Sequence, residues 1–237
     1  MWTLATNFSD EKTQTNIREA RNLKRLVGSW LLALGLLVTG AGGAFLPWIW
    51  RVGVALQLTA PGLAEIVKFL PEIRSGAIEI ERLYLLLPLF LAMFALPLFA
   101  PNQGLCLPVW ARWIMRLAVI PLALAALSPV WTPEVLRAPE FRLQTILAIL
   151  VLGLAVFAGQ LRTLPLKPLV IGLMAGGVTG IVLPIWQFSL IQASMTDVYR
   201  EPVSLGWGWW LTATGIVTSI VAGVVVAFIT NIPENEA

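Results

Sequence analysis

The sequence predicts an all-α, polytopic helical membrane protein with about six transmembrane helices and short outer amphipathic helices. Three observations predict this fold class. Of the 237 residues, 58% are hydrophobic and only 12% are charged, about half the charged fraction of a typical soluble domain. Six long runs carry no charge, and the chain contains eleven tryptophans, a residue that gathers at membrane–water interfaces. A soluble domain could not cover so much apolar side chain with so little polar surface.

The N-terminal segment, residues 1–25, is the one clearly polar stretch. Ile17, Ala20 and Leu23 recur in it at about helical spacing, which favours an amphipathic surface helix leading into the membrane. The polar lead is too long for a secretory signal, and the apolar run behind it is longer than a signal core. We therefore expect this segment to be retained on the cytoplasmic side.

The predicted spans follow from the uncharged runs, because about 20 apolar residues in a helix cross the hydrocarbon core. The third span is the weakest, since its short run contains Pro121 and Pro129, which can kink or end a helix. A single transmembrane domain is expected over residues 26–233, followed by a cytoplasmic tail at 234–237. The six spans are 28–50, 83–100, 114–132, 143–161, 168–188 and 207–230.

Residues 51–82, between the first two spans, are predicted to form an outer interfacial segment of one or two short amphipathic helices. The Thr-Ala-Pro-Gly motif at 59–62 is typical of a helix start, and Glu65 and Lys68 lie on one side of the apolar run that follows. Pro71 ends this helix. About 30 residues cannot close a hydrophobic core alone, so we expect no separate soluble domain.

The distribution of lysine and arginine predicts the orientation. With a cytoplasmic N-terminus, the inner segments hold nine of the 16 basic residues and the outer segments hold seven. The inner loops around 112–116 and 162–167 contain no acid, whereas every outer loop mixes acids with bases. Both termini are therefore predicted to be cytoplasmic.

Small residues mark the faces expected to pack helix against helix. Residues 172, 176 and 180 are glycines spaced four apart, so they share one helix face, as do 35 and 43 with Thr39 between them. Such faces let two helix backbones approach closely in lipid. Packing within the chain is the preferred interpretation, and pairing with another subunit is the alternative. The predicted helix-packing residues are Gly35, Gly40, Gly43, Gly172, Gly176 and Gly180.

The first and fifth spans also resemble each other. Gly35, Gly40 and Gly43 align with Gly172, Gly177 and Gly180 at an offset of 137 residues, and both spans continue into Leu-Pro and then tryptophan. One interpretation is a duplicated helical hairpin around an inserted pair of helices, as in some transporters. The alternative is that glycine-rich spans ending in Leu-Pro are simply common in membranes.

Two sets of polar or amphipathic residues are expected at the outer boundary. Asp197, Arg200 and Glu201 form the most concentrated outer charge cluster; it is either a docking patch or, as we prefer, a set of charges solvated among lipid headgroups. Tryptophan rings are expected to anchor the spans in the headgroup layer. The predicted interface anchors are Trp48, Trp50, Trp186, Trp207, Trp209 and Trp210.

Residues that carry catalysis or bind metals are scarce. The absence of histidine excludes histidine-ligated metal or haem within the chain, and the single cysteine, Cys106, excludes an intrachain disulfide and a cysteine-ligated iron–sulfur cluster. No predicted span has an ionisable residue in its middle, which disfavours a pump or a proton-coupled transporter. There is no phosphate-binding loop motif. We predict no catalytic residue, no cofactor, no metal and no nucleic-acid partner.

The glycine-rich first span ending in Leu-Pro-Trp, together with Gly-Trp-Gly-Trp-Trp at the start of the last span, loosely resembles bacterial membrane proteins without an assigned function. The resemblance implies a bacterial inner (plasma) membrane location and names no family. Small-residue faces, outer amphipathic helices and a charged cytoplasmic lead favour a non-catalytic, accessory subunit that packs against other membrane protein subunits in a larger complex.

Two other functions are compatible with the sequence. The alternative is the permease component of an ABC-type exporter for an apolar or lipid-like cargo, driven by a cytoplasmic ATPase. Its inner loops are short, and the best candidate for gripping an ATPase is the segment 102–113. An enzyme that acts on lipid through acids of the outer loops ranks last, because no pair of acids has an identifiable partner.

Overall fold

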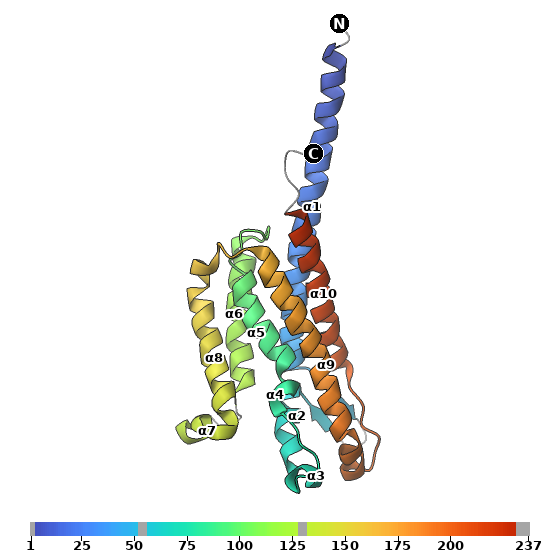
Figure 1. The fold of residues 1–237 in the computed structure, drawn as a ribbon, viewed down its shortest axis with the longest axis vertical. Helices are drawn as coiled ribbons and strands as arrows, with labels where there is room; N and C mark the ends of the chain where they lie inside the picture. Colours follow the sequence, from blue (N-terminus) through green and yellow to red (C-terminus); the bar gives the residue numbers. More distant parts are fainter. Residues whose placement is uncertain (1–2, 52–55, 128–131, 231–237) are drawn as a thin grey trace.

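The computed structural model describes residues 3–51, 56–127 and 132–230, and within these ranges the chain is almost entirely helical (Figure 1). Five helices are long and apolar enough to cross a membrane, which confirms an all-α polytopic membrane protein. The second predicted span, 83–100, contains the shorter apolar helix α5 (Leu87–Phe99) and has no helix of that length. The five long helices are α1 (Thr3–Ala44), α6 (Val109–Ala126), α8 (Pro139–Phe157), α9 (Leu166–Tyr199) and α10 (Trp207–Ile229).

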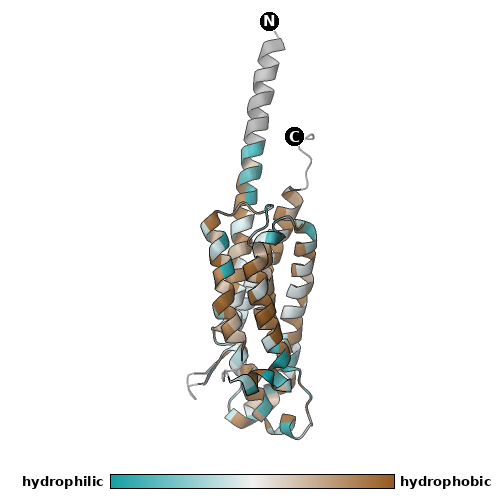
Figure 2. Ribbon diagram, turned by 90° about the vertical axis from the view of Figure 1, so that its left-hand side faces the viewer, coloured by the Kyte–Doolittle hydropathy of each residue, from teal (hydrophilic) through white to brown (hydrophobic). Residues whose placement is uncertain are grey.

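The helical body has two distinct ends. The N-terminal half of α1 projects from one end, where α10 also finishes, and we call this end the terminal face (Figure 1). The two-stranded antiparallel hairpin of β1 (Ile49–Arg51) and β2 (Leu56–Leu58) lies at the other end, which we call the hairpin face. Figure 2 shows an apolar body between these ends, with hydrophilic residues gathered at both. This distribution is what a bilayer-spanning body requires.

Helix α1 is longer at its start and shorter at its end than the sequence predicts. Its 42 residues extend over about 63 Å, and only Arg18–Ala44 has the composition of a span. The predicted span of 28–50 is wrong at its end, because the helix stops at Ala44. Pro47 cannot donate a helical hydrogen bond, and the Trp48 backbone N–H instead donates to the Leu58 carbonyl of the hairpin at 2.7 Å.

The second predicted span, 83–100, is a broken helix. It consists of α4 (Arg82–Leu85) and α5, separated at Leu86. Pro88 explains the break, since it has no N–H to donate to the preceding turn. At 13 residues, α5 covers only about 20 Å.

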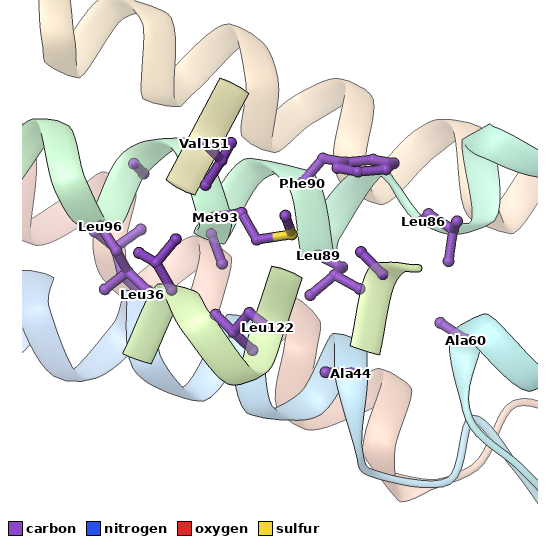
Figure 3. Packing of buried hydrophobic residues seen from close by; sticks show 14 of the residues in the cluster. Leu36, Ala44, Ala60, Leu86, Leu89, Phe90, Met93, Leu96, Leu122 and Val151 are labelled. Atoms are coloured by element: carbon purple, nitrogen blue, oxygen red, sulfur yellow. The ribbon is translucent and has the colours of Figure 1, made fainter. Parts of the chain in front are cut away.

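The short helix α5 is tolerated because protein surrounds it. It contacts α1, α6, α8 and α9, so its ends are covered by other helices and need not match the thickness of the lipid. Figure 3 shows Leu89, Met93 and Leu96 of α5 in the buried cluster. Leu36 of α1 and Leu122 of α6 lie beside them. The centre of the fold is thus α5, which is shorter than the five long apolar helices.

The third and fourth predicted spans correspond to α6 and to α8 with the short 3₁₀ helix η2 (Ala158–Leu161). The predicted third span, 114–132, starts too late. Helix α6 already begins at Val109 and passes through Arg112 and Arg116, whose long side chains can carry their charge to the interface while their stems lie along the helix. Pro121 lies inside α6 without ending it, and Pro129 is outside the described residues.

Helix α9 extends well beyond the predicted fifth span, 168–188. Its 34 residues measure about 51 Å, and Trp186 lies about 30 Å from its first residue, the thickness of a hydrocarbon core. The remaining part runs beside the cap helices at the hairpin face (Figure 1), where Ile191 and Met195 are fully buried. The helix ends at Arg200, which has a left-handed backbone with φ of 54°. Helix α10 matches the predicted sixth span, 207–230, to within one residue.

The segment 51–82 forms a cap on the hairpin face. Helix α2 begins as the sequence predicts, with the Thr59 hydroxyl accepting from the Gly62 backbone N–H. The segment does not simply lie on the membrane surface, however, because Leu63 and Val67 are fully buried in the core cluster. Its apolar face therefore meets protein, not lipid. The cap consists of α2 (Ala60–Ile66), η1 (Val67–Phe69) and α3 (Pro71–Arg74), and a further short helix, α7 (Pro133–Arg137), precedes α8.

Four helices form a closed ring in which α1 and α9 each contact both α5 and α10, while α6 and α8 pack on α5. The first helical hairpin, α1 with α5, and the last, α9 with α10, therefore hold related positions around the ring. Two of the three aligned glycine pairs, Gly40 with Gly177 and Gly43 with Gly180, are buried in both helices, whereas in the third pair Gly35 is buried and Gly172 is exposed. Internal duplication stays a hypothesis.

Candidate interaction sites

The closest helix pair joins the two ends of the chain through a glycine seam, formed by Gly28, Gly35 and Gly42 of α1 with Gly208 and Gly215 of α10. A Cβ added to Gly35 would lie 2.8 Å from the Gly215 carbonyl oxygen, and one added to Gly215 would lie 2.7 Å from the Gly35 carbonyl oxygen. Backbone therefore lies directly on backbone. The glycines on each helix are seven residues apart, a spacing that could have been found in the sequence.

The six glycines predicted to pack differ in what they contact. Gly43 faces the Leu89 backbone of α5, where an added Cβ would lie 3.2 Å from its nitrogen, and Gly40 faces Leu122. Gly176 faces the end of the Leu91 side chain, and Gly180 makes ordinary contacts at 3.8 Å. A Cβ on Gly172 would meet no atom within 4 Å, so Gly172 packs against nothing in the described chain.

Hydroxyl groups along the glycine seam are satisfied locally. Thr39, Thr212 and Ser219 are fully buried, and each donates to the carbonyl four residues earlier in its own helix at 2.8 Å. Such bonds remove the cost of burying a hydroxyl and leave no donor for a passing ion. The buried side chain of Gln187, which is 2% exposed, differs because its Oε1 has no hydrogen-bond partner within the described residues.

The predicted tryptophan anchors fall into two groups. Trp48 and Trp209 are each only 1% exposed and pack edge to face, with ring centroids 4.9 Å apart. The Trp48 indole N–H donates to the Gly42 carbonyl at 3.1 Å. These two rings are core residues that close the hairpin-face end of the glycine seam, and they are not anchors in the headgroup layer. The exposed rings in positions suited to anchoring are Trp50, Trp186, Trp207 and Trp210.

Two tryptophans that the sequence analysis did not select lie near the terminal face. Trp110 and Trp113 of α6 are exposed, and the Trp110 ring lies 5.2 Å from that of Trp30. Arg116 sits over the Trp113 ring at 5.4 Å. Their position just before the apolar part of α6 would have identified them as a second aromatic belt.

Charged residues at the hairpin face form an ion network of Glu65, Lys68, Arg82 and Glu140. Lys68 lies 2.8 Å from Glu65, and Arg82 lies 3.5 Å from both Glu65 and Glu140. Both cations also approach the ring of Phe141, at 5.2 and 5.5 Å. The network joins α2 and η1 to α4 and α8, so its evident role is to hold the cap against the body.

A cavity of about 440 Å³ lies beside this network. Its lining is apolar except for Glu65 and Gln144, and the Gln144 amide donates to the Ala126 carbonyl. The lining has one carboxylate and no second acid or nucleophile, so it suits an apolar group better than a hydrolytic reaction.

The predicted outer charge cluster is located at the end of α9. Asp197 and Arg200 are exposed and Glu201 is half-buried, and none of the three forms an ion pair within the described residues. Two hydrogen bonds hold the segment after α9 against the helix. The Gln192 amide donates to the Val203 carbonyl at 2.8 Å, and the Val203 N–H donates to the Thr196 hydroxyl at 3.3 Å. The interpretation of this cluster as a docking patch and its interpretation as charges solvated among lipid headgroups are both compatible with this position.

An exposed apolar groove lies between α1 and α10, and we call it the α1–α10 groove. It has a volume of about 550 Å³ and lies on the side of the glycine seam where both helices expose apolar side chains, near the projecting part of α1. Its polar contributors are Lys24 and Thr218. The lining residues are Leu23, Lys24, Val27, Gly28, Leu31, Val217, Thr218, Val221, Ala222 and Val225.

Within the described ranges, no group of three or more histidine, cysteine, aspartate or glutamate residues is placed to hold a metal ion. Comparison with known proteins adds no identification, because no family, curated protein or solved structure matches the chain.

Proposed function

We propose that the chain is a non-catalytic integral membrane subunit that packs against a partner membrane protein in a larger assembly. The observation that carries this proposal is the shape of α1, a single helix that continues from the body out past the terminal face (Figure 1). A helix that leaves its own fold in this way has no tertiary support there. Most of the stability of a helix in a protein comes from packing against its neighbours, so a partner is expected to stabilise the projecting part.

The α1–α10 groove supports the same proposal. Val27, Leu31 and Val221 are exposed in it, while Gly28 and Ala222 keep its floor low enough for another helix to approach. It begins at Leu23, on the helix that projects. A partner helix that lies in the groove can therefore also run along the projecting part of α1. One face of the partner would then contact both the groove and this part of α1.

The proposed location is a bacterial inner membrane with both termini in the cytoplasm. The terminal face carries the projecting part of α1 and the acid-free basic stretches 112–116 and 162–167, which fits the rule that lysine and arginine gather on the cytoplasmic side. The hairpin face, where acids balance bases, would then be outer.

The permease of an ABC-type exporter receives less support. Its best candidate for contact with an ATPase, residues 102–113, contains no cytoplasmic helix, because Asn102 and Gly104 are held in a tight loop and α6 begins at Val109. A cytoplasmic ATPase nevertheless remains a possible partner that the experiment below would detect.

The test is purification at native expression in mild detergent after cross-linking in the membrane, with mass spectrometry of the associated proteins. Val221→Trp fills the α1–α10 groove. Val178→Trp is the matched control, because Val178 is equally exposed but lies on α9. We expect wild type and the control to retain the same membrane proteins, and Val221→Trp to lose them at least tenfold.

Two results would reject the proposal. One is recovery of the wild-type chain alone, as a monomer or self-assembled. The other is equal recovery of partners with both variants, which would remove the groove from the interface. If an ATPase is the sole partner recovered, the proposed function changes from an accessory subunit to the permease of an ABC-type exporter.

A further inference from the structure

A second, chemically different cavity opens at the terminal face. It has a volume of about 520 Å³ and lies between α1, the loop after α5, the loop before α9 and the end of α10. We call it the basic pocket, because the charged residues that line it in the described part of the chain are Arg25, Arg162 and Lys167, with no acid among them. Its remaining lining is Asn102, Gln103, Gly104, Thr163, Leu164, Pro165, Leu166, Pro168 and Thr230.

The walls of the basic pocket are fixed by a buried asparagine. Asn102 is 2% exposed, and its amide donates to the Leu164 carbonyl at 2.9 Å while its Oδ1 accepts from the Gly104 N–H at 2.8 Å. Arg25 adds a third tie, donating from Nε to the Gly104 carbonyl at 3.0 Å. The two loops and α1 are thus locked together before any ligand arrives, which lowers the cost of binding one.

The positive charges of the basic pocket are not neutralised by any acid of the described residues. Arg162 and Lys167 form no ion pair among the described residues, unlike Lys68 and Arg82 at the opposite face. Helix α9 also begins at this wall, with Pro165 at its N-cap and no side chain capping its first turn. The free N–H groups and the positive end of a long helix favour an anion beside the two cations.

The surface below the basic pocket is open to lipid. Pro168 lines the pocket, and Gly172 follows one turn further along α9 on the same face. Because a Cβ on Gly172 would meet nothing within 4 Å, this strip of α9 is uncovered by protein. A molecule with an anionic head and an apolar tail could place its head in the pocket and its tail along α9.

We propose that the basic pocket binds the phosphate of an anionic phospholipid, with Arg162 and Lys167 as its charged contacts. Basic pockets between helices at a cytoplasmic boundary are suited to such headgroups. A free phosphate ion offers the same charge and the same acceptor oxygens but no tail. The inference does not depend on the partner subunit proposed above.

The test uses the full chain in neutral detergent, with thermal unfolding and native mass spectrometry as two readouts. The probes are phosphatidylglycerol, phosphatidylcholine and inorganic phosphate. The variant is Arg162→Gln with Lys167→Gln, which leaves the structural Arg25 in place. The control is Arg137→Gln with Arg142→Gln, two exposed cations near α8 whose removal changes the net charge equally.

We expect phosphatidylglycerol to raise the unfolding temperature of wild type and control and to remain bound in the mass spectrometer. Phosphatidylcholine should do neither. The pocket variant should fold without lipid as well as wild type does, and should bind phosphatidylglycerol at least tenfold more weakly. If the control binds phosphatidylglycerol as weakly as the pocket variant does, the loss of binding is explained by the change in net charge, and the proposal is overturned. Stabilisation by inorganic phosphate alone, without an effect of phosphatidylglycerol, would overturn the lipid as the source.

Discussion

At the scale of single residues, glycine controls how the chain closes. Gly35 and Gly215 bring the backbones of α1 and α10 to a distance at which no side chain fits between them. In lipid, where apolar area gives helices no preference for each other over the bilayer, this close contact is a principal source of attraction. The polar residues of the seam, satisfied in their own helices, add no cost to it.

Replacing Gly35 by leucine should therefore destabilise the protein. Its Cβ would fall 2.5 Å from the Ser219 hydroxyl oxygen and 2.8 Å from a carbonyl oxygen, so α1 and α10 would have to separate. We expect a loss of about 3 kcal/mol or more, at or above the usual range for overpacking, because backbone cannot move aside. Gly172→Leu is the control and should change little. The measurement is the unfolding temperature in detergent, and similar values for the two variants would contradict the role of the seam.

The same residues show what spacing alone can predict. The four-residue pattern pointed to Gly35 and Gly43, which do pack, and equally to Gly172, which does not. A small residue permits close contact, but only the position of the neighbouring helix decides whether contact occurs. Trp48 and Trp50 make the same point, since they are two residues apart and one is buried while the other is exposed. The turn into β1 separates them, and nothing in the apolar run predicts that strand.

At the scale of elements, the hairpin-face cap depends on Arg82. This residue belongs to α4, yet it reaches Glu65 of α2 and Glu140 of α8 and lies over the Phe141 ring. It therefore links the cap to two parts of the body that are distant in sequence. Its side chain is largely shielded, so the network should exceed the value of an exposed pair.

Arg82→Gln should loosen the cap without unfolding the bundle. Loss of the ion pairs and the ring contact is expected to cost about 1–2 kcal/mol locally, which corresponds to a roughly five- to thirtyfold rise in the open population. Limited digestion with a non-specific protease should then cut residues 71–81 faster by a similar factor. Arg74→Gln, an exposed cation in the same segment, is the control. Equal cleavage of the two variants would show that the network does not hold the cap.

The elements also show where hydropathy fails as a guide to length. Helix α10 lies against lipid along its exposed side, and its predicted limits were accurate. Helix α5 is enclosed by protein, so its length is set by its neighbours and by Pro88, and the predicted span was too long. Helix α9 was predicted too short because its last third, which contains several polar residues, continues as a helix that is packed against protein through Ile191 and Met195. The length of an uncharged run indicates how much of a helix can lie in lipid. The length of the helix itself also depends on its contacts with other parts of the protein.

At the scale of the whole molecule, the glycine seam brings the first and last helices together, and the acid-free basic stretches 112–116 and 162–167 lie at one face. The α1 extension, the α1–α10 groove and the basic pocket all lie at or near this terminal face. An orientation with this face in the cytoplasm would place the partner, the anionic lipid and the projecting helix on the same side of the membrane. The opposite orientation would separate the basic pocket from the leaflet whose anionic lipids it fits.

The single cysteine makes this orientation directly measurable. In a Cys106→Ala background, Asn22→Cys places a thiol at an exposed site on α1 near the terminal face, and Arg137→Cys places one at an exposed site on α7 near the hairpin face. A membrane-impermeant maleimide should label Arg137→Cys in right-side-out vesicles and Asn22→Cys only in inverted ones, because basic loops are retained in the cytoplasm. The reverse pattern would place the hairpin face inside. The cytoplasmic partner would then be sought at the cap and the end of α9, where Asp197 and Arg200 are exposed.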